Sequence, residues 1–196
     1  MKNKASVALR LMAGLIDFLL IAGFFLFLVW RLASAGTILD LLNSLLTILT
    51  FLFLTILAPF INSYLICRLG GTIGKLLTGT RIVNPEGKKV SFWRAFLRNY
   101  LGYMVSSMLL WLGFIWIAID KERRGWHDLM ADTYVVVVNK AGAVIGMLSL
   151  LILLLANIFL GFEIFRSISG NVPFYQSVIN DISKEFQQSL NTPQLL

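Results

Sequence analysis

One carboxylate, Asp17, interrupts an apolar run that otherwise continues from Leu11 to Trp30. A charged side chain at the centre of a membrane helix costs roughly 2.5–3.5 kcal/mol, so it usually faces protein or a water-filled cavity. Arg10 lies two helical turns earlier on the same face, about 10 Å away along the axis, and is a candidate partner. Asp17 could bind a cation or carry a proton. The structural alternative is that it holds the first helix against its neighbours.

A second group of charges falls within six residues later in the chain. It consists of Arg123, Arg124, His127 and Asp128. Asp128 can pair with Arg124 or cap a helix, and histidine titrates near neutrality, so a structural latch and a proton relay are both open. The chain has one histidine and no second soft ligand at zinc spacing, so we expect no metal site.

Polar side chains also recur at helical spacing within the second apolar segment. The candidates for a polar path are Asn43, Thr47, Thr50 and Asn62. Such a stripe could line a permeation path beside Asp17, although hydrogen bonding between helices is its more frequent use.

No arrangement typical of an enzyme is present. The chain has neither a Ser-His-Asp nor a Cys-His pattern. Gly74 and Lys75 resemble the end of a phosphate-binding loop, but Leu69 and Leu76 stand where that loop needs Gly and Ser or Thr. We therefore expect no enzymatic activity and no cofactor. Anionic lipid headgroups suffice as partners for the basic loop, so nucleic acid is not needed to explain it.

The composition indicates a chain built for the lipid bilayer. Hydrophobic residues make up 58% of the 196 residues, charged residues make up 14%, and the mean hydropathy is +0.80. Soluble domains carry about a quarter charged residues. Four apolar stretches, at about 11–33, 41–67, 97–119 and 139–162, each provide the roughly 20 residues that a crossing needs.

The distribution of basic residues predicts the orientation. Three precede the first stretch, at Lys2, Lys4 and Arg10, and the loop 68–96 between the second and third stretches is strongly basic. Cytoplasmic segments carry an excess of Lys and Arg. We therefore expect the N-terminus and the loop 68–96 to be cytoplasmic.

The third stretch, 97–119, is basic on both flanks, whereas the tail 163–196 lacks this bias. An extracytoplasmic tail requires an odd number of crossings. We therefore predict an all-α integral membrane protein with three full transmembrane helices and a third stretch that is re-entrant or in-plane, broken between Ser106 and Gly113. Trp111 in its middle also fits poorly with an ordinary span. Four full spans are the alternative.

Two local patterns complete the chain. Thr80–Val83 and Tyr134–Val138 are β-branched and could pair as a small ribbon, or they could be irregular surface segments. In the tail, Phe174, Val178, Ile182, Phe186 and Leu190 recur every four residues. This spacing predicts an amphipathic helix that lies on the membrane or on the rest of the protein.

Several short motifs, taken in order, resemble the RDD family of membrane proteins. They are Arg10 to Asp17, the segments 71–75 (GTIGK) and 94–99 (RAFLRN), and the segment 124–133 (RGWHDLMADT). The family is named for an arginine and two aspartates, which correspond here to Arg10, Asp17 and Asp128. At Asp132 the family more often has glycine. The resemblance covers roughly residues 5–138, so we place an RDD-like membrane domain at 1–138, with the basic motif at 120–133.

The resemblance implies a class of activity rather than a substrate. Transport of unidentified ligands has been suggested for the family, and some members are linked to exchange of monovalent cations for protons. We expect cation- or proton-linked transport with Asp17 as the intramembrane carboxylate. The alternative is a non-transporting scaffold, assembly factor or partner subunit whose charges are structural. We further expect a multi-pass protein of the bacterial inner membrane that forms a homo-oligomer or joins a larger membrane partner.

Overall fold

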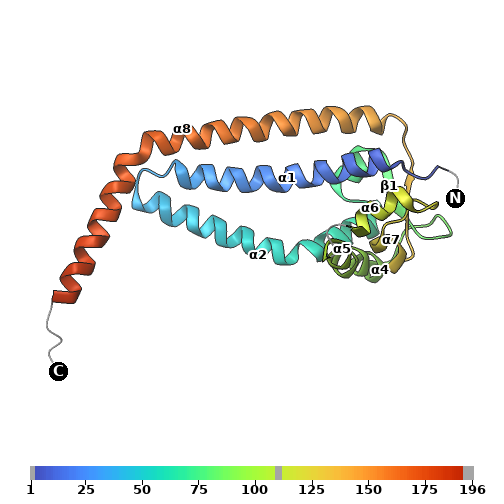
Figure 1. Ribbon diagram of the computed structural model, residues 1–196, viewed down its shortest axis with the longest axis horizontal. Helices are drawn as coiled ribbons and strands as arrows, with labels where there is room; N and C mark the ends of the chain where they lie inside the picture. The colour runs from blue at the N-terminus through green and yellow to red at the C-terminus, as the bar shows by residue number, and fades with distance from the viewer. Residues whose placement is uncertain (1–2, 109–111, 192–196) are drawn as a thin grey trace, which may run out of the picture.

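The architecture is a bundle of three long helices with a smaller, charged region at one end (Figure 1). The computed structural model describes residues 3–108 and 112–191. The long helices are α1 (Val7–Ala33), α2 (Ile38–Leu69) and α8 (Gly142–Asn191). Within the described residues, these three are the single helices that are long and apolar enough to cross a membrane. The predicted helical membrane architecture with three such helices is confirmed.

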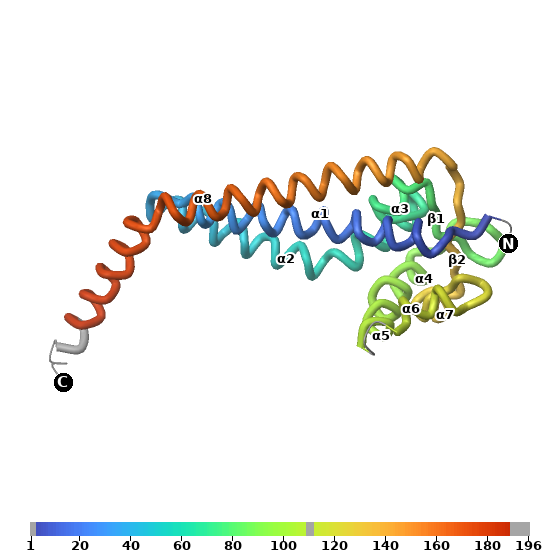
Figure 2. Tube along the Cα trace, turned by 45° about the horizontal axis from the view of Figure 1, so that its top comes forward, coloured from blue at the N-terminus to red at the C-terminus, as the bar shows by residue number. Residues whose placement is uncertain are grey.

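Local sequence determines where the helices begin. Ser6 caps α1 by accepting a hydrogen bond from the Leu9 amide, and Thr37 and Asp40 form a reciprocal capping box at the start of α2. The short link between α1 and α2 makes them antiparallel neighbours. Helix α8 lies along α1 in the same direction, so its C-terminal end points away from the N-terminus of the chain (Figures 1 and 2).

Hydrogen bonds to free carbonyls hold α8 against α1. Asn157 Nδ2 donates to the Leu19 carbonyl at 3.2 Å and Asn171 Nδ2 donates to the Ala33 carbonyl at 2.9 Å. The predicted last span and the predicted tail are one continuous helix in the structure. Ile182 and Phe186 of the predicted tail stripe are 62% and 64% exposed, and the side chain of Leu190 lies outside the described residues.

The described part of residues 70–140 forms a compact region, which we call the head, around the N-terminal half of α1 (Figure 2). Its elements are α3 (Ile73–Leu77), β1 (Thr80–Val83), α4 (Phe92–Leu97), the π-helical turn η1 (Arg98–Gly102), α5 (Tyr103–Met108), α6 (Leu112–Ile119), α7 (Trp126–Met130) and β2 (Tyr134–Val137).

The predicted ribbon is confirmed. Strands β1 and β2 pair antiparallel, with Thr80 opposite Val137 and Val83 opposite Tyr134. The amide of Ala5 donates to the Val135 carbonyl at 2.9 Å, so the N-terminal segment runs alongside β2. A small apolar core fixes the ribbon to the end of α2 and to α4. Its buried residues are Ala5, Ile66, Ile82, Val90, Ala95 and Val135.

The third apolar stretch is not one straight helix. Its two arms, Phe92–Met108 and Leu112–Ile119, are bent by 94° relative to each other, a geometry that fits either a broken span or a re-entrant segment. The arms touch: a Cβ added to Gly113 would lie 2.6 Å from Ser106 Cα, so only glycine permits this approach. Residues 109–111, which include Trp111 and the middle of the predicted break, lie outside the described residues.

Candidate functional site

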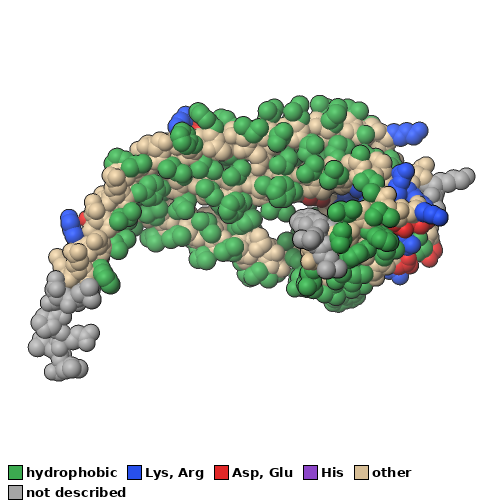
Figure 3. Space-filling model, in the orientation of Figure 1, with side chains coloured by type: hydrophobic (Ala, Val, Ile, Leu, Met, Phe, Trp, Pro, Cys, Tyr) green, Lys and Arg blue, Asp and Glu red, His purple; other side chains and the backbone are tan. Residues whose placement is uncertain are grey.

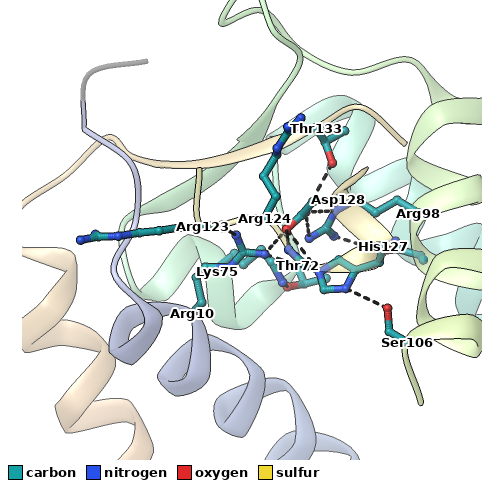
Figure 4. Close-up of polar contacts among 12 residues, drawn as sticks. Arg10, Thr72, Lys75, Arg98, Ser106, Arg123, Arg124, His127, Asp128 and Thr133 are labelled. Carbon is teal, nitrogen blue, oxygen red and sulfur yellow. Dashed lines mark hydrogen bonds and ion pairs between the residues drawn. The ribbon is translucent and has the colours of Figure 1, made fainter. Parts of the chain in front are cut away.

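Asp128 is the centre of a buried charge cluster in the head (Figure 4). Its side chain is fully buried, and both of its oxygens accept hydrogen bonds. Oδ2 accepts from Arg10 and from the Gly125 amide at 3.1 Å, while Oδ1 accepts from Arg98 Nε at 2.9 Å and from the Thr133 hydroxyl at 3.4 Å. One carboxylate therefore ties together α1, η1 and α7.

The two arginines satisfy Asp128 from opposite elements. Arg98 is fully buried and Arg10 nearly so, and each forms an ion pair with the same carboxylate. Arg10 also donates to the Arg123 carbonyl at 2.6 Å, which fixes the loop before α7. Although burial opposes ionisation, the charges of Arg98, His127 and Arg10 hold the pKa of Asp128 well below its ordinary value. Asp128 is therefore a permanent anion near neutral pH.

Asp17 performs a different task, and the expected pair between Arg10 and Asp17 is wrong. Asp17 Oδ2 accepts from the Thr72 hydroxyl at 2.6 Å, and Oδ1 accepts from the Gly74 amide at 2.7 Å. The carboxylate thus caps the first turn of α3, where the free amides and the helix dipole favour an anion. Gly74 allows the close approach, because a Cβ there would lie 2.1 Å from the Ala13 carbonyl oxygen.

His127 is buried beside the cluster. Its ring lies 4.9 Å from the Tyr103 ring and 5.0 Å from the Phe114 ring, measured between centroids. Burial lowers the pKa of His127 well below its ordinary value; the nearby arginine charges act in the same direction and Asp128 opposes them. Arg10 lies 3.5 Å from Nε2 and can only donate, so Nε2 accepts and Nδ1–H points to the Ser106 hydroxyl at 3.3 Å.

Arg124 does not reach Asp128, contrary to the expected pairing. Its guanidinium lies 4.8 Å above the Tyr134 ring, and it approaches the exposed carboxylate of Asp132 at 3.8 Å. Asp132 has a positive φ of 47°, a left-handed conformation that glycine adopts without strain. This backbone requirement accounts for the glycine that the resembling family more often has there.

The polar residues of α2 do not join the cluster. The Thr47 hydroxyl donates to the Asn43 carbonyl at 2.7 Å, and the Thr50 hydroxyl donates to the Leu46 carbonyl at 2.9 Å, so both are satisfied within their own helix. Asn62 is half-buried and Asn43 is exposed. The site cavity described below is lined by other residues.

Three polar residues of the site escaped the analysis of individual candidates: Thr72, Lys75 and Arg98. Arg98 is the second carboxylate-binding arginine, and its signal was its place in the motif 94–99. Thr72 and Lys75 lie in the motif 71–75, but a short helix that folds back onto α1 has no clear periodic signature in five residues. Ser106 was singled out only as a flank of the predicted break.

A cavity of about 860 Å³ adjoins the cluster between α1 and the two arms α5 and α6. Its walls are mainly apolar, and its polar lining residues are Arg10, Asp17, Lys75, Arg98, Ser107 and His127. Both candidate functions of Asp17 would have to act through this space. Among the described residues, no group of three His, Cys, Asp or Glu side chains could hold a metal ion.

Long apolar helices and a head held to them by one buried carboxylate define a helical membrane protein with a structural ion-pair network. The RDD family model matches residues 4–132, and the chain belongs to the RDD family. The chain is 33% identical over 132 residues to uncharacterized protein YckC of Bacillus subtilis (strain 168), covering 65% of this chain and 80% of YckC.

A second relative matches over a shorter segment. Uncharacterized protein YxaI of the same organism is 36% identical over 69 residues, which cover 35% of this chain and 44% of YxaI. The match thus spans less than half of YxaI. No solved structure matches the chain.

Replacement of Asp128 by Asn should lower the free energy of unfolding by about 3–5 kcal/mol, because it leaves two buried guanidinium groups without their carboxylate. Thermal unfolding of detergent-solubilised protein, followed by circular dichroism, measures the change. Asp181→Asn on the exposed part of α8 is the matched control and should change stability by less than about 0.5 kcal/mol. Equal effects of the two substitutions would contradict a central role of Asp128.

Stability should decrease as the pH falls from about 7 to 5. In this window unfolded His127 takes up a proton near its ordinary pKa of about 6.5, whereas the folded residue stays neutral because its pKa is lowered. The slope should approach, at most, about 1.4 kcal/mol per pH unit. His127 is the one histidine of the chain, so His127→Gln should flatten the profile of melting temperature against pH. An unchanged slope in this variant would refute the assignment.

Proposed function

We propose that this RDD family protein is a non-transporting membrane subunit, a scaffold or partner protein, in which the buried charges fasten the head to the bundle. The observation that carries the proposal is the state of the two family carboxylates. Both oxygens of Asp17 and both oxygens of Asp128 already accept hydrogen bonds from fixed protein donors. Release of these donors would be needed before either carboxylate could bind a cation or exchange a proton.

The energetics favour the same conclusion for Asp128. Its lowered pKa makes protonation near neutral pH unfavourable, and removing either arginine would expose an unpaired buried charge. A carboxylate held in this way is suited to a fixed joint rather than to a titrating carrier. We place the protein in a bacterial plasma membrane with the head on the cytoplasmic side, because the basic residues gather at the head end (Figure 3).

This placement predicts that the two ends of α8 lie on opposite sides of the membrane. After Cys67→Ser, a single cysteine introduced by Gln187→Cys should react with a membrane-impermeant maleimide in intact bacterial cells. A cysteine introduced by Lys88→Cys in the exposed head loop should react only after permeabilisation. Labelling of both positions in intact cells, or the reverse pattern, would contradict the orientation.

Cation- or proton-linked transport is the second candidate, and one observation favours it. Asp17 is only half-buried and lines the cavity beside α1, so solvent or an ion could reach it from that side. A transport cycle would then require Asp17 to exchange its contacts with Thr72 and Gly74 for a cation or a proton.

Proteoliposomes that contain the purified protein and a trapped pH indicator separate the two candidates. We expect no cation-dependent proton movement with Na⁺, K⁺ or Li⁺ between pH 6 and 9. We also expect Asp17→Asn to weaken the attachment of α3 by about 1–3 kcal/mol, because it removes a charged acceptor from the Thr72 hydroxyl and the Gly74 amide. Proton movement by the wild type that disappears in a folded Asp17→Asn variant would overturn the proposal and establish transport.

A further inference from the structure

The cavity beside the charge cluster has a composition that the fastening role does not require. Its apolar walls come from the outer face of α1 and from α5 and α6. Leu11, Phe18, Met104 and Ile115 line it and are between 48% and 64% exposed. Its volume of about 860 Å³ lies within the range of roughly 300–1,000 Å³ typical of small-molecule sites. The cavity is therefore a groove whose apolar side is open at the surface of the helices.

The polar end of the groove carries an excess of positive charge. Arg10, Lys75 and Arg98 all line it, whereas the carboxylates that face these cations are Asp17 and Asp128. His127 is neutral because burial lowers its pKa. Three cations against two carboxylates leave one positive charge without a counter-ion.

Lys75 is the residue whose charge is left over. It is 7% exposed, and its ammonium group forms no ion pair with any residue in the described part of the chain. Its one hydrogen bond, of 3.4 Å, goes to the Thr72 hydroxyl, which already donates to Asp17. An ammonium group has three donors, and a buried charge is costly unless it is paired. Lys75 thus lines the groove with donors to spare.

We propose that the groove binds an anionic amphiphile from the bilayer, with its acyl chain along α1, α5 and α6 and its phosphate or carboxylate head beside Lys75. A bilayer lipid enters such a groove from the side, and the apolar walls exclude a fully hydrophilic anion. The head supplies the missing negative charge, and its oxygens accept hydrogen bonds from the ammonium group. This binding role goes beyond the fastening function and does not depend on it.

Gly14 offers a direct way to fill the groove. It lies on the exposed face of α1 within the lining, and a Cβ added there meets no atom within 4 Å. Gly14→Leu should fold normally, because leucine favours a helix over glycine, and its side chain should occupy the space of the acyl chain. Gly161→Leu on α8 is the matched control, since that glycine also has nothing within 4 Å and lies outside the lining.

Delipidated protein in a non-ionic detergent is titrated with dioleoylphosphatidylglycerol, oleate, dioleoylphosphatidylcholine or inorganic phosphate, and native mass spectrometry counts the bound molecules. We expect one anionic amphiphile per chain, with phosphatidylcholine and inorganic phosphate at least roughly tenfold weaker. Preference for phosphatidylglycerol would identify a phospholipid as the source, and preference for oleate would identify a free fatty acid. Both results support the proposal.

The substitutions separate a built site from general lipid attraction. Gly14→Leu should abolish the bound amphiphile, and Lys75→Met should weaken it roughly tenfold or more. Gly161→Leu and Lys88→Met, the latter on the exposed head loop, should leave it unchanged. Equal binding of phosphatidylcholine, or retention of the amphiphile in Gly14→Leu and Lys75→Met, would overturn the proposal. Circular dichroism and gel filtration verify that each variant is folded.

Discussion

The structure depends on one carboxylate shared by two arginines. Asp128 draws Arg10 from the start of the first long helix and Arg98 from the middle of the head, and all three side chains are removed from water. Such a joint resists both rupture and protonation, because either event leaves a guanidinium group buried without a counter-charge. The head has a small apolar core, so this joint provides much of the specificity with which the head sits on the end of the bundle.

Asp17 extends the same logic along α1. Rather than pairing with an arginine, it provides an anion at the beginning of α3 and brings that short helix against its own backbone at Ala13 and Gly74. A helix of five residues is not stable alone, and the carboxylate supplies part of what it lacks. Two of the three family residues therefore meet directly, and the third acts one layer deeper through hydrogen bonds.

The bundle and the head divide the physical tasks. The three long helices expose leucine, isoleucine and phenylalanine side chains along most of their length, which suits lipid and not water (Figure 3). The head gathers the charges at one end, and between the two lies a groove that is apolar on one side and cationic on the other. Neighbouring chemistry of this kind is typical of a boundary between hydrocarbon and headgroups, where amphiphiles reside.

The sequence by itself determined the membrane class, the three long helices, the β-ribbon and the residues Arg10, Asp17, Asp128 and His127, because hydropathy, β-branching and isolated charges are local signals. Tertiary structure alone decided the pairing: Arg10 with Asp128 across 118 positions, Arg98 in place of Arg124, and Asp17 with Thr72 and Gly74. Seven residues along a helix suggested that Arg10 and Asp17 would meet, but spacing within one helix says nothing about what other elements bring near. A charge takes whichever partner the folded chain places within hydrogen-bonding distance, and only the packing of α3, η1 and α7 around α1 determines that.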